Sequence, residues 1–322
     1  MKVGVWIPCY RSWVRAEEVR RLATMAEELA FDSLWVQDHL VAPVGTLART
    51  RVEPMYKNLD GADAAVPDLS AVDYYGAENW WLDPYVLWGF LTGCTSRVQL
   101  GSSIIVLPYR DPVVQAKMLG TLDVLSSGRM IFGVGVGHVE AEFAALGVPF
   151  AERGARSDEY LRLIRAFVQG NELSFEGAFA NLPEVRPLIR SVQRPHPPVF
   201  VGGNSRRAVR RAVELGDAWF PTEIEPDVLA DGMAYLRQVA DTSGTPVPDV
   251  AAALVWGLED PRSSYIGPRT RSYYSVPQAA GLLSEYARLG VTHLAIDLPN
   301  PNVSVLLRQL ELLSEAVAHR DR

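Results

Sequence analysis

Cysteine is scarce in this sequence: the 322 residues contain only Cys9 and Cys94. Two cysteines give neither a disulfide framework nor a CxxC metal pattern, so an apolar core must hold the fold together. The longest apolar run, from Tyr85 to Cys94, has ten residues and is too short to cross a bilayer. HExxH, clustered acidic metal ligands and Gly-x-Ser-x-Gly are also absent, which argues against a metal site and against the commonest hydrolase signature.

Positive charge is also in short supply. The net charge is −7, and lysine occurs only at Lys2, Lys57 and Lys117. A nucleic-acid partner would require a concentrated basic surface that neutralises phosphates, so we expect none. Residues 2–8 have the pattern of a strand and lack the charged, apolar and cleavage regions of a signal peptide. We therefore predict a cytoplasmic protein with no membrane partner.

Short β-branched runs alternate with amphipathic stretches along the whole chain, which predicts βα units around a parallel sheet. Eight strand–helix pairs favour one (β/α)8 TIM barrel domain over residues 1–322. A doubly wound dinucleotide fold is disfavoured, because no Gly-x-Gly-x-x-Gly turn follows the first strand. The strands are expected at 2–8, 33–38, 97–106, 130–135, 197–202, 217–221, 249–257 and 291–298, and the helices at 15–30, 82–94, 111–126, 153–170, 205–216, 226–242, 276–289 and 302–318.

A plain barrel takes about 250 residues, which leaves roughly 70 of the 322 for insertions. We place these insertions near 41–81, 171–196 and 258–275. The first and third follow strands two and seven and so lie at the C-terminal face, where barrel enzymes have their sites. We interpret them as lids over a pocket, the alternative being surface excursions without a role. A loop as long as 41–81 is uncommon without a function.

Candidate catalytic groups follow the second and fourth strands. Strand two ends in Asp38 and His39, and a carboxylate beside an imidazole can orient it for acid–base work. The alternative is a histidine that caps the strand end. Strand four runs into Gly135, Gly137 and then Glu142, where the glycines permit close approach of a ligand or a tightly packed turn. Glu142 is expected in the first turn of the following helix.

The fifth strand opens through Gly202 and Gly203 into a helix that begins near Arg206. The main-chain N–H groups at that helix start form an anion site, most naturally for a phosphate. An ordinary helix with Asn204 or Ser205 as N-cap is the alternative, and both interpretations can hold together. No lysine of the Walker type is present, which excludes a P-loop for nucleoside triphosphates.

Taken together, these segments resemble the luciferase-like monooxygenase superfamily, whose barrels bind FMN or the deazaflavin F420. The resemblance is spread over most of residues 1 to about 222. It is carried by Ala30-Phe-Asp-Ser-Leu-Trp-Val-Gln-Asp-His-Leu40, Leu100-Gly-Ser-Ser-Ile-Ile-Val-Leu-Pro-Tyr-Arg-Asp-Pro112, Ala116 to Arg129, Gly133 to Phe143, Arg153 to Glu159, Pro195 to Gly203 and Leu215 to Trp219.

The resemblance implies a ring stacked over the C-terminal mouth, with a phosphate held by main-chain N–H groups. His39 matches a histidine near the reactive edge of the cofactor, and we expect Asp38 and Glu142, from their positions after strands two and four, to complete the catalytic set. Family members commonly have a non-prolyl cis peptide bond behind the ring. The matching bond here is Ser103–Ile104. The remaining cofactor-binding positions implied are Gly135, Gly137, His138, Gly202, Gly203 and Asn204.

The resemblance is strongest to the F420-dependent oxidoreductases. Several FMN-using relatives have a tyrosine after the arginine that matches Arg153, and here that position is Gly154. We therefore expect hydride transfer between F420 and a small organic substrate, in a homodimer. Aromatic residues such as Trp6, Tyr56, Trp80 and Trp81 favour an apolar substrate, with packing as the alternative. Two other functions stay open: an FMN-dependent monooxygenase supplied by a separate reductase, and a cofactor-binding protein without turnover.

Overall fold

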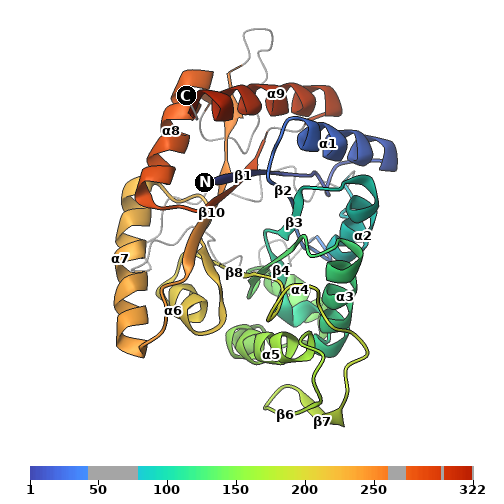
Figure 1. Ribbon diagram of the computed structural model, residues 1–322. Helices are drawn as coiled ribbons and strands as arrows, with labels where there is room; N and C mark the ends of the chain where they lie inside the picture. The colour runs from blue at the N-terminus through green and yellow to red at the C-terminus, as the bar shows by residue number, and fades with distance from the viewer. Residues whose placement is uncertain (43–78, 260–272, 299–300, 321–322) are drawn as a thin grey trace.

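The computed structural model describes most of the chain, drawn in colour in Figure 1. Most of the two expected lids, and with them Tyr56, lies outside the described residues. The described residues are 1–42, 79–259, 273–298 and 301–320. Among the helices in these ranges, none combines the length and the apolar character needed to span a bilayer.

Eight parallel strand positions form a closed barrel, which confirms the predicted (β/α)8 fold (Figure 1). The third position consists of two short strands, β3 (Gln99–Ser102) and β4 (Ile105–Val106), separated by a cis peptide bond between Ser103 and Ile104. Both strands pair with β5, and this closes the sheet. The other positions are β1 (Lys2–Trp6), β2 (Ser33–Val36), β5 (Met130–Gly135), β8 (Val199–Gly202), β9 (Ala218–Phe220), β10 (Asp249–Val255) and β13 (His293–Asp297).

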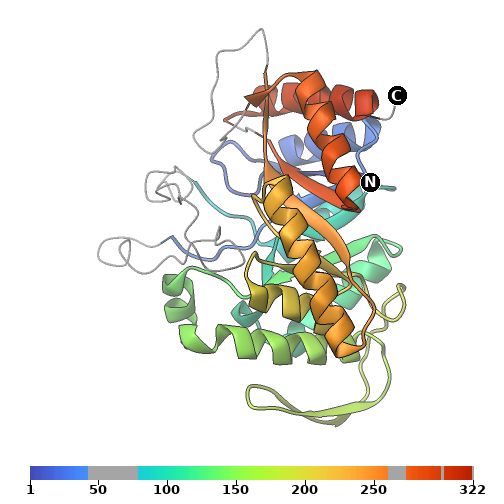
Figure 2. The ribbon, with the colours of Figure 1, turned by 90° about the vertical axis from the view of Figure 1, so that its left-hand side faces the viewer.

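Eight long helices surround the barrel, each within two residues of its predicted start (Figures 1 and 2). They are α1 (Ala16–Glu28), α2 (Pro84–Cys94), α3 (Pro112–Leu125), α5 (Arg153–Phe167), α6 (Arg206–Leu215), α7 (Pro226–Ser243), α8 (Val276–Leu289) and α9 (Val303–Arg320). One short helix was not predicted, α4 (Glu140–Leu146), which follows β5. Seven residues are too few to show a helical period clearly.

The predicted insertion at 171–196 contains an antiparallel hairpin, which projects from the barrel beyond α5 in Figure 1. Its strands are β6 (Leu173–Glu176) and β7 (Asn181–Val185). The carboxylate of Glu159 on α5 accepts hydrogen bonds from three successive N–H groups of the hairpin turn, at 2.6 to 2.8 Å. Because these N–H groups have no partner in the hairpin ladder, Glu159 anchors the turn to the barrel.

Helices α2 and α3 begin with the same Asp-Pro sequence. Asp83 accepts hydrogen bonds from the first free N–H groups of α2, and Asp111 does the same for α3. In each helix a proline takes the first helical position, where its missing N–H costs nothing. These caps fix where the polypeptide leaves the mouth of the barrel and enters the outer ring of helices.

The barrel interior is filled by side chains and is separate from the larger core between sheet and helices. Trp35 is fully buried there and lies against Phe200 and Phe220, with ring centroids 6.0 and 5.0 Å away. Gly4 and Gly101 make room for its indole, because a Cβ at either position would come within 2.5 Å of the ring. The interior is therefore a packed core below the mouth.

A buried polar chain lies at the lower end of this interior. The Trp35 Nε1–H group donates to Ser33 Oγ, and Ser33 Oγ lies 2.7 Å from His293 Nε2. A hydroxyl has one donor and two acceptor sites, so Ser33 either donates to an unprotonated Nε2 or accepts from Nε2–H, according to the tautomer of His293. Burial, with smaller contributions from Lys2 and the N-terminal amino group, lowers the pKa of His293 to about 3. Folding therefore requires this imidazole to be neutral.

This requirement predicts acid sensitivity of the fold. Below pH 6.5, the ordinary histidine pKa, His293 is protonated in the unfolded chain but stays neutral in the folded protein. The free energy of unfolding therefore decreases as the pH is lowered from about 6.5 to about 3. Between pH 7.5 and 5 the loss should be about 2 kcal/mol from this residue. His293→Gln should flatten the pH dependence of the unfolding free energy by that amount, measured by urea titration. His319→Gln, at an exposed histidine, is the control; equal slopes in both variants would contradict this assignment.

Candidate active site

Side chains that follow different barrel strands meet at one end of the molecule. His39 comes after β2, His138 after β5, and the Gly203–Asn204 turn after β8. Because the strands are parallel, their C-terminal ends lie on the same face of the barrel. The side chain of His39 is 11% exposed, so its imidazole is close to solvent but largely enclosed.

The hydrogen-bond partner of His39 is Glu142. The imidazole Nδ1 lies 3.1 Å from Oε2 and 3.2 Å from Oε1 of this carboxylate. Glu142 stands in the first turn of α4, as predicted, and is completely buried. Its carboxylate also accepts the Leu40 N–H at 2.6 Å and the Tyr109 hydroxyl at 2.5 Å. The buried charge of Glu142 thus joins the segment after β2 to the segment after β4.

These contacts decide the ionisation state of the pair. Burial by itself raises the pKa of Glu142, but the hydrogen bond and charge of His39 and the donors Tyr109 and Leu40 outweigh burial, so the pKa lies below its ordinary value. A carboxylate in this state only accepts hydrogen bonds, so Nδ1 of His39 must carry a hydrogen. Proton exchange with a bound molecule is then left to Nε2.

Asp38 does not orient His39, contrary to the prediction from their adjacency. Its buried carboxylate accepts two hydrogen bonds from Arg110, at 2.7 and 2.9 Å, and one from the Val106 N–H at 3.1 Å. Successive side chains in extended backbone point to opposite sides, which separates Asp38 from the partner of its neighbour. Arg110 also donates to Asp83 at 2.7 Å. Asp38 therefore fixes the turn that follows β4.

Aromatic rings surround the imidazole of His39. The Trp81 ring meets it edge-on with centroids 4.6 Å apart, and His138 does so at 5.8 Å. Trp81 in turn stacks on Tyr10 at 4.7 Å. Trp80, by contrast, is 40% exposed and lies under the Arg15 guanidinium at 4.4 Å. Of the aromatic residues expected to contact a substrate, Trp81 is next to the candidate catalytic group, whereas Trp80 packs against Arg15.

Ile104 lies between β3 and β4 at the C-terminal side of the barrel, and we call it the floor of the candidate site. Its side chain is half-buried and packs on the interior cluster, directly after the cis peptide bond with Ser103. A Cβ on Gly135 or on Gly202 would lie 2.6 or 2.7 Å from the Ile104 side chain. These two glycines, which were predicted to leave space for a ligand, therefore leave space for the side chain of Ile104. Gly137 has a φ of +79° and packs against Val106, so it shapes the turn after β5.

The Gly202–Gly203 turn leads into α6 as predicted, and Ser205 is the N-cap that accepts the Ala208 N–H at 3.3 Å. The Asn204 side chain exchanges two hydrogen bonds of 2.8 Å with the main chain of Thr222. It therefore braces two loops of the mouth, with its amide oxygen and one of its two amide N–H groups engaged. Main-chain N–H groups of the first turn of α6 have no acceptor within the helix, and they are the donors suited to an anion.

One further donor at the mouth lacks an acceptor. Trp6, the last residue of β1, packs on the interior cluster as Ile104 does, and its indole Nε1 is buried with no hydrogen-bond partner among the described residues. Buried donors of this kind are rare in native proteins, so a polar atom of a bound molecule is a candidate acceptor for this one. A half-buried aliphatic floor, an orphaned N–H and a helix start together fit a ring system with a phosphate.

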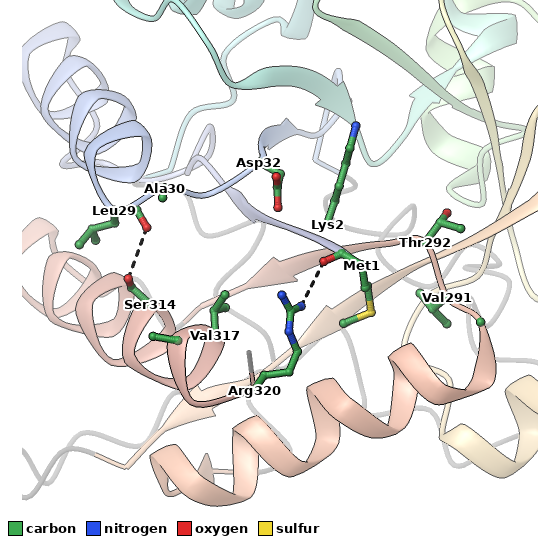
Figure 3. Close-up of a pocket in the computed structure, with 12 residues that line it drawn as sticks. Met1, Lys2, Leu29, Ala30, Asp32, Val291, Thr292, Ser314, Val317 and Arg320 are labelled. Atoms are coloured by element: carbon green, nitrogen blue, oxygen red, sulfur yellow. Dashed lines mark hydrogen bonds between the residues drawn. The ribbon is translucent and has the colours of Figure 1, made fainter. Parts of the chain in front are cut away.

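Two further observations concern other kinds of site. Within the described residues, no three His, Cys, Asp or Glu side chains form a group that could hold a metal ion. A hollow of about 850 Å³ lies at the opposite end of the barrel, where Met1, Lys2 and Arg320 line it (Figure 3). Arg320 donates to the Met1 carbonyl there at 3.1 Å. Because barrel enzymes use the C-terminal face, this hollow is not the candidate active site.

Sequence reasoning missed Tyr109 and Arg110. Both lie in the segment that follows β4, whose 3-10 turn spans Leu107–Tyr109. Neither residue belongs to a pattern that indicates its partner, because Glu142 and Asp38 are separated from them by 33 and 72 residues. The one local signal is the helix start at Asp111-Pro112, which indicates that the preceding residues form a turn.

Comparison with known proteins agrees with this architecture. The family model for luciferase-like monooxygenases matches residues 1–258. A Mycobacterium tuberculosis protein without assigned function is 30% identical over 167 residues, 52% of this chain but only 57% of its own length. A second one from that species is 31% identical over 242 residues, 71% of this chain and 80% of the relative. The FMNH(2)-dependent dimethylsulfone monooxygenase of Pseudomonas putida is 30% identical over 163 residues, 50% of this chain and 44% of that enzyme.

Solved structures share the fold at low sequence identity. The monooxygenase RslO1 from Streptomyces bottropensis superposes with a TM-score of 0.75 at 18% identity and full coverage of both chains. The coenzyme F420-dependent tetrahydromethanopterin reductase from Methanopyrus kandleri superposes with a TM-score of 0.73 at 16% identity, covering 99% of each chain. At these identities the likeness concerns the barrel alone.

Proposed function

The chain belongs to the luciferase-like monooxygenase family, and from this membership and its site we propose an F420-dependent oxidoreductase that transfers a hydride between the deazaflavin and a small organic substrate. The observation that carries the proposal is the His39–Glu142 pair at the barrel mouth, beside a floor that fits a flat ring. When bound, the cofactor supplies the hydride chemistry, and the protein supplies orientation and proton exchange.

His39 is the proposed proton-exchanging group. Oxidation of an alcohol to a carbonyl compound would release a proton from its oxygen, and the cofactor, when bound, would take up the hydride. Nε2 of His39 accepts that proton, while Nδ1–H stays hydrogen-bonded to the ionised Glu142, which stabilises the imidazolium that forms. In the reduction direction the same nitrogen returns the proton. Glu142 thus acts through His39, and Asp38 acts by holding the adjacent turn.

The proposed cofactor contacts are made by residues at the C-terminal mouth of the barrel. Ile104 lies beneath the ring, the Ser103–Ile104 peptide bond faces it from behind, and His138 borders it beside His39. The glycines Gly135, Gly137, Gly202 and Gly203 shape this cradle, with the Gly203 N–H donating to the Phe220 carbonyl, and main-chain N–H groups from Asn204 into α6 hold the phosphate. Trp6 joins this set through its unpartnered indole N–H. Gly154 supports F420, because it replaces a tyrosine that grips the phosphate in several FMN enzymes.

A second candidate function is an FMN-dependent monooxygenase supplied with reduced flavin by a separate reductase. The Pseudomonas putida relative, named for its use of FMNH(2), favours it. The same cradle would serve this reaction. In either case we propose a homodimer, for which Val86 on α2 and Val114 on α3, 74% and 54% exposed, are candidate contacts.

Cofactor choice is tested by titrating the protein separately with F420 and with FMN at fixed salt, following cofactor fluorescence. We expect a micromolar or lower dissociation constant for F420 and binding of FMN at least tenfold weaker. The opposite preference would contradict the F420 proposal and support the monooxygenase. Tight binding of either cofactor without turnover over a panel of alcohols and carbonyl compounds would favour a binding protein without catalysis.

The role of His39 is tested by His39→Ala in single-turnover kinetics with the bound cofactor. Loss of a general acid–base group typically lowers the rate about 10²- to 10⁴-fold. The dissociation constant of the cofactor should change less than threefold, since the phosphate and floor contacts remain. His319→Ala, at an exposed histidine near the end of α9, is the matched control and should have no effect. An unchanged rate in His39→Ala would remove His39 from the mechanism.

A further inference from the structure

We propose that Tyr109 is a positioning residue for His39, acting through the Glu142 carboxylate. The Tyr109 hydroxyl donates to Oε2 of Glu142 at 2.5 Å, and the same oxygen lies 3.1 Å from Nδ1 of His39. Tyr109 is too deeply buried, at 5% exposure, to meet a ligand at the mouth. Its effect on the reaction rests on the proposed role of His39, but its effect on the imidazole does not.

The hydroxyl decides how the carboxylate is held. Oε1 accepts the Leu40 N–H at 2.6 Å, and Oε2 accepts the Tyr109 hydroxyl, so each oxygen has one short hydrogen bond. The His39 Nδ1–H points between them, at 3.1 and 3.2 Å. Without the hydroxyl, Oε2 would keep only this shared donor although Glu142 is completely buried. An underbonded buried carboxylate rotates or takes up a proton, and either change releases Nδ1.

Packing holds both partners of this hydrogen bond. The Tyr109 ring meets the ring of Phe143, the residue after Glu142, edge-on with centroids 5.2 Å apart. Phe143 makes the same kind of contact with Phe150 at 5.2 Å. Because these aromatic contacts fix the side chains of Tyr109 and Phe143, the hydroxyl cannot leave Glu142 without disturbing this apolar cluster.

The turn that carries Tyr109 is fixed by Asp38, the neighbour of His39. Asp38 accepts from the Val106 N–H before the turn and from the Arg110 side chain after it. The amide of Gln115 donates to the carbonyls of Leu107 and Arg110, both at 2.9 Å. Asp38 and His39, at the end of β2, are therefore both connected to the turn that carries Tyr109, Asp38 directly and His39 through Glu142. This explains why Asp38 is buried beside the site without contacting the imidazole.

The test reads the ring nitrogens of His39 directly. The chain has only five histidines, so ¹⁵N-histidine labelling gives few long-range ¹H–¹⁵N correlations to assign. At pH 8.5, where an ordinary imidazole is neutral, we expect His39 of the unmodified protein to carry its hydrogen on Nδ1 alone. Tyr109→Phe removes only the hydroxyl and should give a mixture of both tautomers. Tyr160→Phe is the matched control, since that buried tyrosine bonds Arg156 and not Glu142.

Turnover provides the second readout. Tyr109→Phe should lower the rate about tenfold, with the dissociation constant of the cofactor changed less than twofold, whereas Tyr160→Phe should change neither. A single Nδ1–H tautomer in Tyr109→Phe would overturn the proposal whatever the rate. If Tyr109→Phe changes the tautomers of His39 but the unmodified protein turns over no substrate, the positioning role of Tyr109 would stand and the proposed function would be refuted. If Tyr109→Phe does not fold, Glu142→Gln should give the same mixed tautomers, and an unchanged spectrum there would overturn the proposal equally.

Discussion

The mouth of this barrel depends on one buried carboxylate. Glu142 lies at zero exposure and joins the end of β2, the turn after β4 and the start of α4 through four polar contacts. A buried charge is tolerated only when its hydrogen bonds are satisfied. Displacement of any one of these three segments would therefore destabilise the contacts of the other two. The orientation of His39 is a consequence of this constraint.

A second, similar junction lies on the other side of the same turn. The Asp38 carboxylate binds Arg110 and the Val106 N–H, and Arg110 continues to Asp83, the N-cap of α2. The interior cluster is bordered by the half-buried side chains of Ile104 and Trp6, and among the described residues the Trp6 indole N–H has no hydrogen-bond partner. The polar junctions are thus placed around a floor that suits a flat ring, and the chemistry proposed for His39 follows from that placement.

The barrel was predictable because its signal is repeated: eight β-branched runs alternate with eight amphipathic stretches, and each is long enough to show its period. His39 was found because it follows a strand. Glu142 was also a candidate, but its pairing with His39 was not found, because it lies 103 residues away on a helix of seven residues and adjacency pointed instead to Asp38. Gly135 was expected to admit a ligand or a packed turn and Gly202 to open an anion site, but sequence alone did not indicate that Ile104 fills the space beside both.

The central claim is that a deazaflavin lies on this floor with its reactive edge at His39. The most direct measurement is a crystal structure of the protein with F420 bound. The account predicts a ring stacked over Ile104 with C5 beside Nε2 of His39, a ring acceptor on the Trp6 indole N–H, and the phosphate at the start of α6. A ring that lies away from His39, or a phosphate bound elsewhere than α6, would contradict it.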